Sequence, residues 1–464
     1  MPATTVDLTV RNARVVTENG VLEGGVAIDD GTIAAIGSSA GLPDGSTSID
    51  AGGNFLIPGV IDPHVHLGRR DAGYPDQLRI DFETETRGAM HGGVTTVINF
   101  VEHADEYLPH FESFVEVGEA NSYIDFSHHF VISHEHHIDE IEGLAGRGAK
   151  SFKMFFNMYK YHDIDIEPCE ADRVYRVLSK TADIPDAIGM FHAENAELQR
   201  EREAAVRASG AHDLRAWCAA SPNVAEAMQI DHIGHLTAFT DARSYCVHVS
   251  SAEGVDAVER AQQRGAQVIG ETLVNFLINT YDDELGVWGK ISPPIRGERS
   301  QQRLWAGLRS GVIDHVGTDH IATSKEDIEM GRGQHGDHMW ERPPGLQPSL
   351  EYFLPMMLTE GYNRNRLSMQ RLVEVCSTNT AKRFGLYPRK GHIAEGADAD
   401  LVVVDPDATT VIDDDFFHTR EPRWSPVHGR EVRGLPTHTI VGGELAVREG
   451  ERLVEPGGGS FLPR

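Results

Sequence analysis

The two ends of the chain share one pattern of apolar and polar positions. Residues 6–36 alternate between the two at every second position and are interrupted by Asn-Gly and Asp-Gly, the dipeptides of tight hairpin turns. Residues 399–449 repeat this alternation, which is typical of half-buried β-strands. We therefore predict a small β-sandwich domain assembled from both termini, residues 1–54 and 398–464.

The middle of the chain follows another pattern. Eight short apolar runs rich in β-branched residues are separated by stretches of helical period, such as residues 171–181 and 252–264. Eight strand–helix units predict an α/β fold, a (β/α)8 TIM barrel over residues 55–397. This segment is longer than the ~250 residues of a bare barrel, which implies long loops. The apolar runs lie near residues 59–65, 95–100, 122–132, 149–156, 188–194, 244–250, 266–272 and 315–320.

The net charge of the chain indicates which classes of binding partner are unlikely. The 464 residues carry a formal net charge of −29, which disfavours nucleic acid or an anionic membrane as a partner. This acidity fits either salt adaptation or ordinary solvation. The sequence has no apolar run near the ~18 residues of a membrane span and no start typical of a secretory signal. We therefore expect a cytoplasmic globular enzyme that acts on a small molecule.

Polar residues at the ends of the apolar runs form the candidate site, because the active site of such a barrel lies at the carboxyl ends of its strands. His64 and His66 share one face of the first strand, so both imidazoles can point into the barrel mouth and bind one ion. Four later strands add the ligand-type residues Lys153, His192, His248 and Asp319. Five strands that each deliver such a residue at the same end indicate a metal site.

These residues lie in motifs that run across nearly the whole chain. The set resembles the amidohydrolase superfamily, in the branch of dihydropyrimidinases, hydantoinases and allantoinases, and LYPRKG is particularly similar to hydantoinases. The motifs are PGVIDPHVHLG (58–68), SFKMFF (151–156), FHAEN (191–195), VHVSSAEG (247–254), GET (270–272), KISPPIR (290–296), GTDH (317–320), STNTAKRFGLYPRKGHIAEGADADLVVVDP (377–406) and SPVHGREVRG (425–434).

The resemblance implies a binuclear metal-dependent hydrolase of C–N bonds. Lys153 would take up CO2, and its carbamate would bridge two divalent ions, zinc first, with manganese or cobalt also suited to the ligands. By similarity, one ion is held by His64, His66 and Asp319 and the other by His192 and His248. A metal-bridging hydroxide would open a cyclic amide or imide of the hydantoin or dihydropyrimidine type, while Asp319 carries the proton to the leaving nitrogen. The resemblance also favours a homodimer or homotetramer.

The expected substrate contacts depart from the family. A tyrosine usually stands five positions after the bridging lysine and donates to the developing oxyanion; here it stands at the sixth, as Tyr159, with Asn157 as a substitute donor. GETLVNF places Asn275 in the substrate loop, and Glu341 stands where an asparagine usually contacts the ring. The backbone of Ser292 is expected to bind the cyclic imide edge.

Two other functions stay open at this point. The altered substrate loops also suit an open-chain urea, carbamate or thiocarbamate, as in the phenylurea and molinate hydrolases of the same superfamily. A non-catalytic scaffold similar to the dihydropyrimidinase-related proteins is disfavoured, because those proteins have lost metal ligands that are all present here. The histidine-rich residues 134–137 (His-Glu-His-His) are predicted to lie in an exposed loop beyond the third strand rather than in a second metal site.

Overall fold

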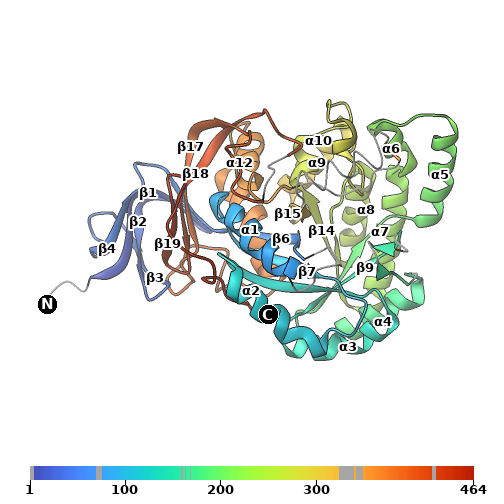
Figure 1. Ribbon diagram of the computed structural model, residues 1–464, viewed down its shortest axis with the longest axis horizontal. Coiled ribbons are helices and arrows are strands. Elements are labelled where there is room, and N and C mark those ends of the chain that lie inside the picture. The colour runs from blue at the N-terminus through green and yellow to red at the C-terminus, as the bar shows by residue number, and fades with distance from the viewer. Residues whose placement is uncertain are drawn as a thin grey trace.

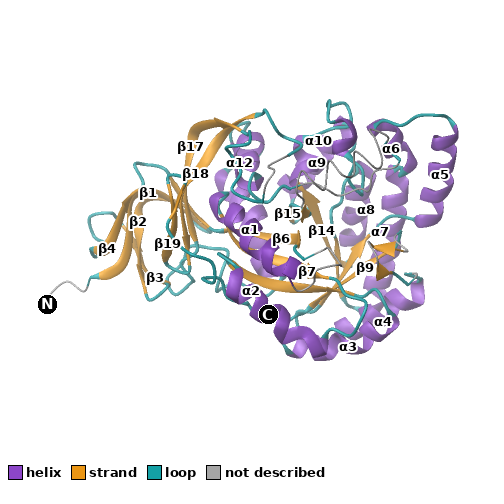
Figure 2. Ribbon diagram, viewed as in Figure 1, coloured by secondary structure: helices purple, strands orange, loops and turns teal. Residues whose placement is uncertain are grey.

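The structure, a computed structural model, consists of a barrel and a mixed sheet beside it (Figures 1 and 2). It describes residues 5–68, 76–157, 160–161, 164–167, 169–322, 339–340, 348–420 and 425–464. The barrel and the β-rich domain built from both ends, which the hydrophobic pattern predicted, are confirmed. Within the described residues, no helix is both long and apolar enough to cross a membrane.

The barrel is a parallel sheet whose strands follow one another in chain order. Its strands are β6 (Val60–His66), β7 (Val94–Val101), β8 (Asp125–Val131), β9 (Ser151–Phe155), β12 (Ile188–His192), β13 (Arg243–Cys246), β14 (Gln267–Leu273), β15 (His315–Gly317) and β16 (His320–Ile321). β14 pairs with β15, and β16 pairs with β6, so the two shortest strands together close the ring. Thr318 and Asp319 lie between them. A separate two-stranded hairpin is formed by β10 (Lys160–Tyr161) and β11 (Ile164–Asp165).

Helices cover the outside of the barrel (Figure 2). They are amphipathic: α8 buries Val255, Val258 and Ala261 on one face, at the spacing that a helix of 3.6 residues per turn requires. The α-helices are α1 (Asp76–His91), α2 (Phe111–Asn121), α3 (Glu135–Gly146), α4 (Ala171–Ala182), α5 (Ala196–Ala208), α6 (Leu214–Ala220), α7 (Asn223–Thr240), α8 (Ala252–Gln263), α9 (Val274–Ile278), α10 (Glu298–Ser310), α12 (Phe353–Met357), α13 (Met369–Val373) and α14 (Asn379–Arg383). Shorter helical turns are η2 (Leu108–His110), η3 (Gly286–Gly289), η4 (Leu358–Tyr362) and η5 (Glu374–Thr378).

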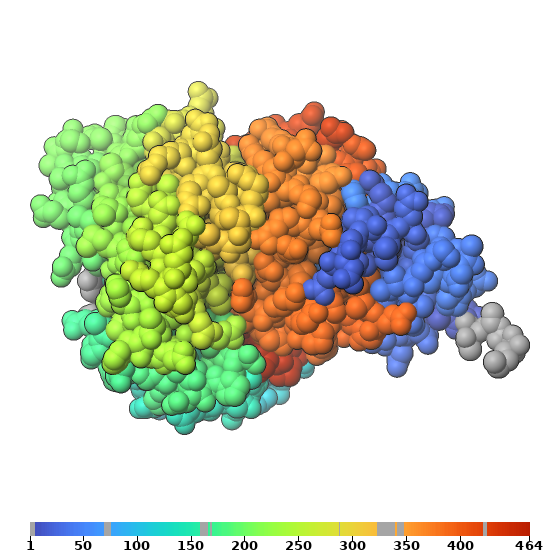
Figure 3. Space-filling view, turned by 180° about the vertical axis from the view of Figure 1, so that it is seen from behind, coloured from blue at the N-terminus to red at the C-terminus, as the bar shows by residue number. Residues whose placement is uncertain are grey.

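The second sheet joins the two ends of the chain (Figure 1). Its strands are β1 (Val6–Thr17), β2 (Gly20–Asp29), β3 (Thr32–Gly37), β4 (Gly45–Asp50), β5 (Phe55–Pro58), β17 (Leu401–Val411), β18 (Glu431–Val441), β19 (Glu444–Arg448) and β20 (Glu451–Arg452). β5 is its central strand, parallel to β1 and antiparallel to β17. Residues 55–58, which we assigned to the barrel segment, therefore pair with the terminal strands. Figure 3 shows the blue N-terminal residues against orange residues from the C-terminal third.

The last residues of the chain return to the barrel at the end opposite the carboxyl ends of its strands. The backbone amide of Leu462 donates to the carbonyl oxygen of Phe126 near the start of β8, and the amide of Phe126 donates to Ser460. Leu462 also belongs to the apolar cluster that fills the barrel interior. Phe384, just after α14, belongs to the same cluster. The backbone amide of Arg464 donates to the carbonyl oxygen of Gly148. This end of the barrel is thus closed by residues from the C-terminal part of the chain.

The buried ammonium group of Lys390 joins the barrel to the terminal sheet. The side chain of Lys390 is 1% exposed, and its Nζ lies 2.6 Å from Asp125 at the start of β8, 3.3 Å from Asp398, and in contact with Asp400 just before β17. Burial lowers the pKa of Lys390, but the three carboxylates outweigh it and raise the pKa above its usual range. The lysine therefore keeps its charge and neutralises a cluster of acidic groups between the barrel and the terminal sheet.

Replacing this lysine should destabilise the protein strongly. Lys390→Met would leave three carboxylates near one another without their cation, and we expect the free energy of unfolding to fall by about 3–5 kcal/mol. The control is Lys382→Met, whose side chain is 44% exposed and pairs with Glu18 at the surface, so its loss should cost at most about 1 kcal/mol. Thermal unfolding of both variants measures the difference. Equal melting temperatures would contradict this role of Lys390.

Candidate metal centre

The six candidate metal ligands lie toward the carboxyl ends of the barrel strands. His64 and His66 end β6, His192 ends β12, and Lys153 lies in the middle of β9. His248 follows β13 by two residues, and Asp319 stands between β15 and β16. The backbone of His248 has φ +40° and that of Asp319 φ +51°, in the region that residues with a side chain rarely adopt. Such strain persists where the surrounding structure enforces it, often at functional sites.

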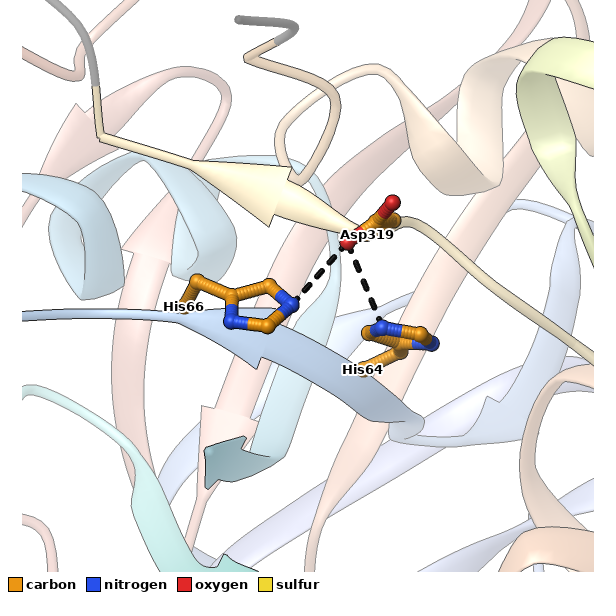
Figure 4. A group of neighbouring side chains, drawn as sticks. All are labelled: His64, His66 and Asp319. Atoms are coloured by element: carbon orange, nitrogen blue, oxygen red, sulfur yellow. Dashed lines mark ion pairs between the residues drawn. The ribbon is translucent and has the colours of Figure 1, made fainter. Parts of the chain in front are cut away.

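Three of these residues converge on one point. The Nε2 atoms of His64 and His66 lie 3.2 Å and 3.0 Å from the same carboxylate oxygen of Asp319 (Figure 4). The ligand atoms of the three residues all lie within 4.8 Å of one another. Both histidines are almost fully buried. This set of nitrogen and oxygen donors suits a divalent transition metal.

Three of the candidate histidine ligands, His64, His66 and His192, each contact a carboxylate. Nδ1 of His64 lies 2.9 Å from Glu271, Nδ1 of His66 lies 3.0 Å from Glu102, and Nε2 of His192 lies 2.7 Å from Glu194. Such partners fix the orientation and tautomer of a metal-binding imidazole. We did not predict them; the only signals were acidic residues inside or directly after apolar strands, as in the GET and FHAEN motifs.

The charges around His64 favour a cation at this point. Burial lowers the pKa of His64, but the carboxylates of Glu271 and Asp319 outweigh it and raise the pKa to about 9. Burial likewise raises the pKa of Asp319, and His64 and His66 bring it well below its usual range. A site that attracts a proton this strongly also attracts a metal ion, which would take the proton's place.

His192 and His248 form a second pair of nitrogen donors. Nδ1 of His192 lies 2.9 Å from Nε2 of His248, and both rings are buried. Nδ1 of His248 is also buried, and among the described residues it has no hydrogen-bond partner. Burial and the neighbouring His192 hold the pKa of His248 well below its usual range, so the ring is neutral and can donate a lone pair. The ring of His248 lies 5.5 Å from that of His64, so the two groups of donors are adjacent.

Lys153 lies in an apolar setting at the same site. Its side chain is buried, with Nζ 5.3 Å from the ring centre of Phe100 and 5.0 Å from that of Phe155. Burial lowers its pKa to about 7, and the nearby carboxylates of Glu271 and Asp319 oppose this only in part. A large fraction of the amine is therefore uncharged and nucleophilic near neutral pH.

The predicted substrate contacts are only partly described. Nδ2 of Asn157 donates to Glu194 at 3.1 Å, and the hydroxyl of Ser292 donates to the same oxygen at 3.3 Å, so both stand beside the partner of His192. Asn275 is buried and accepts a hydrogen bond from the hydroxyl of Tyr352 at 2.7 Å. Tyr159 and Glu341 lie outside the described residues. The substrate roles of all five stay predictions.

The histidine-rich residues 134–137, which we expected in an exposed loop, lie instead at the start of α3, where His137 is buried. His134 precedes this helix, and its side chain caps the helix together with that of His137. Nε2 of His137 donates to the carbonyl oxygen of Asp105 at 3.0 Å. In the described part of the chain, the acidic cluster around Lys390 is the one other group of three or more side chains with ligand spacing, and the lysine ammonium lies within it.

Comparison with known proteins identifies the family. The sequence pattern described as the amidohydrolase family matches residues 55–446. The chain belongs to this family. This amidohydrolase is 33% identical to the L-hydantoinase of Paenarthrobacter aurescens over 466 residues, which cover 99% of this chain and 98% of the relative.

Other relatives agree over the full length. The D-hydantoinase of Geobacillus stearothermophilus is 31% identical, over 98% of this chain and 96% of its own. Among solved structures, the L-hydantoinase (dihydropyrimidinase) from Arthrobacter aurescens superposes with a TM-score of 0.90 at 32% identity, covering 99% of this chain and 100% of that one. The resemblance stated from the motifs is thus confirmed.

Proposed function

We propose that this amidohydrolase opens a cyclic amide or imide of the hydantoin or dihydropyrimidine type by hydrolysis. The observation that carries the proposal is the convergence of His64, His66 and Asp319 at the mouth of the barrel, within a chain similar to hydantoinases over its full length. The paired nitrogens of His192 and His248 beside them support a site for two ions rather than one.

The ligands fit two divalent cations, zinc first, with manganese or cobalt as alternatives. His64, His66 and Asp319 would hold one, and His192 and His248 the other. When bound, the ions supply positive charge that polarises the substrate carbonyl and makes water a stronger nucleophile. The free amine of Lys153 would add to the carbon of CO2, releasing one proton and leaving an anionic carbamate that would serve as a further metal ligand.

Asp319 is the proton carrier in this proposal. Its low pKa keeps the carboxylate ionised at neutral pH, so it can accept a proton from the attacking water. It would then return this proton to the ring nitrogen as the C–N bond breaks. The product is a single open-chain molecule. It carries the new carboxylate and still contains the nitrogen of the broken C–N bond.

The remaining residues would bind and orient the ring. The backbone of Ser292 would hydrogen-bond the imide edge, and Tyr159, or Asn157 in its place, would donate to the developing oxyanion. Asn275 and Glu341 complete the expected contacts. The apolar residues Leu273 and Val274 in the substrate loop favour apolar substituents over a polar ureide, so we expect little turnover of allantoin.

A second candidate keeps the metal centre and takes an open-chain urea, carbamate or thiocarbamate. The displacement of the tyrosine to Tyr159 and the glutamate at Glu341 favour it, because both alter the contacts expected for a ring.

Side-by-side kinetics test the order of these candidates. We expect kcat/KM for 5-phenylhydantoin to exceed that for an N-alkyl carbamate by about tenfold, the effect of one well-placed hydrogen bond to the imide edge. The Asp319→Asn variant gives the background rate for both substrates. Hydrolysis of the carbamate alone would reverse the order and favour the open-chain candidate.

A further inference from the structure

The carboxylate of Glu194, the partner of the candidate metal ligand His192, is also bonded to two of the expected substrate contacts. Glu194 lies two residues after β12 and has no exposed surface. Its Oε2 atom lies 2.7 Å from Nε2 of His192 and accepts hydrogen bonds from Nδ2 of Asn157 at 3.1 Å and from the hydroxyl of Ser292 at 3.3 Å. One carboxylate oxygen therefore connects a metal ligand with residues that are expected around the substrate.

The other oxygen of this carboxylate, Oε1, is held by residues between β12 and α7. Nε2 of the half-buried Gln199, in α5, donates to it at 3.0 Å, and the hydroxyl of Ser221, just after α6, donates to it as well. Nε2 of Gln199 also donates to this hydroxyl at 2.7 Å, which closes a ring of three hydrogen bonds. The guanidinium of the buried Arg296 bonds the backbone oxygen of Ser221 and the hydroxyl of Ser250, so the ring is anchored in the loops of the barrel.

The direction of these hydrogen bonds follows from Glu194, because an ionised carboxylate accepts hydrogen bonds and donates none. Gln199 must present its amino group to the carboxylate, which leaves its Oε1 atom as an acceptor. Nδ2 of Asn157 donates to this oxygen at 2.9 Å, in addition to its bond with Glu194. Gln199 thus bonds both Glu194 and a neighbour that Glu194 also holds. Both hydrogens of the Asn157 amide are used in this way, which favours Tyr159 over Asn157 as the donor to the oxyanion.

The ligands proposed for the two ions have separate carboxylate partners. Glu194 contacts His192, which belongs to the pair that would hold the second ion. His64 and His66, which would hold the first ion, contact other carboxylates. Because a carboxylate fixes the orientation of a metal-binding imidazole, a restraint on Glu194 should act on the second ion only. A general loss of stability would instead weaken the binding of both ions.

We propose that Gln199 is a positioning residue of the metal centre, which holds Glu194 so that Nδ1 of His192 faces the second ion. This inference rests on the two-ion centre of the proposed function. Without the amide of Gln199, Glu194 would lose the hydrogen bond at 3.0 Å and Ser221 the one at 2.7 Å, so the carboxylate could rotate and the imidazole with it. Gln199 acts on His192 through Glu194, and its role is to raise the affinity of the centre for the second ion.

Gln199→Met tests this role with little change in volume. Loss of the amide should lower the affinity for the second zinc ion about tenfold, the lower part of the range found when the partner of a metal-binding histidine is altered, and leave the affinity for the first ion within about a factor of two. Equilibrium dialysis against buffered free zinc measures both binding steps without any turnover, and His192→Ala shows which step belongs to the second ion. The control is Gln262→Met in α8, where a half-buried amide donates to the backbone oxygens of Val268 and Val312 at the other end of the barrel strands.

A double-mutant cycle shows whether the effect passes through Glu194. In a Glu194→Gln background, Gln199→Met should change the affinity for the second ion by less than about a factor of two, because the carboxylate that Gln199 holds is gone. Ser221→Ala should weaken the same binding step, since its hydroxyl donates to the same carboxylate oxygen. Losses that add in the cycle would overturn the proposal.

The outcomes separate this inference from the proposed function. If the parent protein binds no second ion, the two-ion centre of the proposed function fails, and this inference with it. If the parent binds two ions and Gln199→Met binds both with the affinities of the parent, only the positioning role is wrong. Equal losses of affinity for both ions would indicate a weakened fold and would also overturn the positioning role. If the role is correct, free zinc high enough to fill the second site restores kcat for 5-phenylhydantoin in Gln199→Met.

Discussion

Lys153→Ala is expected to have no measurable hydrolytic activity and to retain less than its normal metal content. The lysine is buried near the carboxylates of Glu271 and Asp319, and its pKa of about 7 leaves part of the amine uncharged and able to take up CO2. Without the carbamate, the centre would lose an anionic ligand, so we expect it to hold less metal. Metal analysis of the purified variant, together with its turnover of 5-phenylhydantoin, measures both effects.

Rescue by small acids makes this prediction specific. In Lys153→Ala the lost side chain leaves a cavity, so acetate or propionate should restore part of the activity by placing a carboxylate where the carbamate stood. Lys153→Met fills the same space with an apolar side chain, and we expect no rescue there. Lys180→Ala, at a half-buried position on the outer helix α4, serves as the control for purification and metal loading. Full activity and normal metal content in Lys153→Ala would remove this residue from the centre.

Asp319→Asn should keep the fold and lose turnover by a factor of about 10²–10⁴. The amide has nearly the same shape as the carboxylate, and its oxygen can still face His64 and His66. It neither accepts a proton from water nor returns one to the leaving nitrogen, so the chemical step slows. Steady-state kinetics and metal analysis should show a large loss of kcat with most of the metal retained.

The control for this variant is Asp183→Asn, the same change at an exposed position just after α4. We expect it to match the parent in kcat and KM. An Asp319→Asn enzyme within a factor of three of the parent would exclude Asp319 as the proton carrier.

The fold was largely predictable because the two hydrophobic periods are distinct. Alternation at every second residue marks the terminal strands, and apolar runs of β-branched residues mark the barrel strands. The assignment of residues 55–58 to the barrel segment shows the limit of this reasoning. β5 and β6 are both buried throughout and are separated only by Gly59, so no change of period separates one sheet from the other.

The sequence predicts the candidate metal ligands better than it predicts the residues that contact them. His64 and His66 can be found from strand position alone, since two imidazoles two residues apart at a strand end point the same way. Glu271 could not be matched to His64, because 207 residues separate them and only the closed barrel brings them together. Gln199 is harder still, since nothing in a glutamine of a polar helix distinguishes a contact with Glu194 from an ordinary solvated position.

The central position of β5 in the terminal sheet bears on how the protein is made. When β1 to β5 leave the ribosome, one edge of β5 has no partner, because β17 is synthesised more than 300 residues later. Through most of translation, the N-terminal strands therefore present an open β-edge, which can pair with other chains. Completion of this domain is therefore a late event, because it depends on contacts between strands more than 300 residues apart in the sequence. If translation stops before residue 401, the nascent chain contains the barrel strands, but β5 still lacks its partner strand β17.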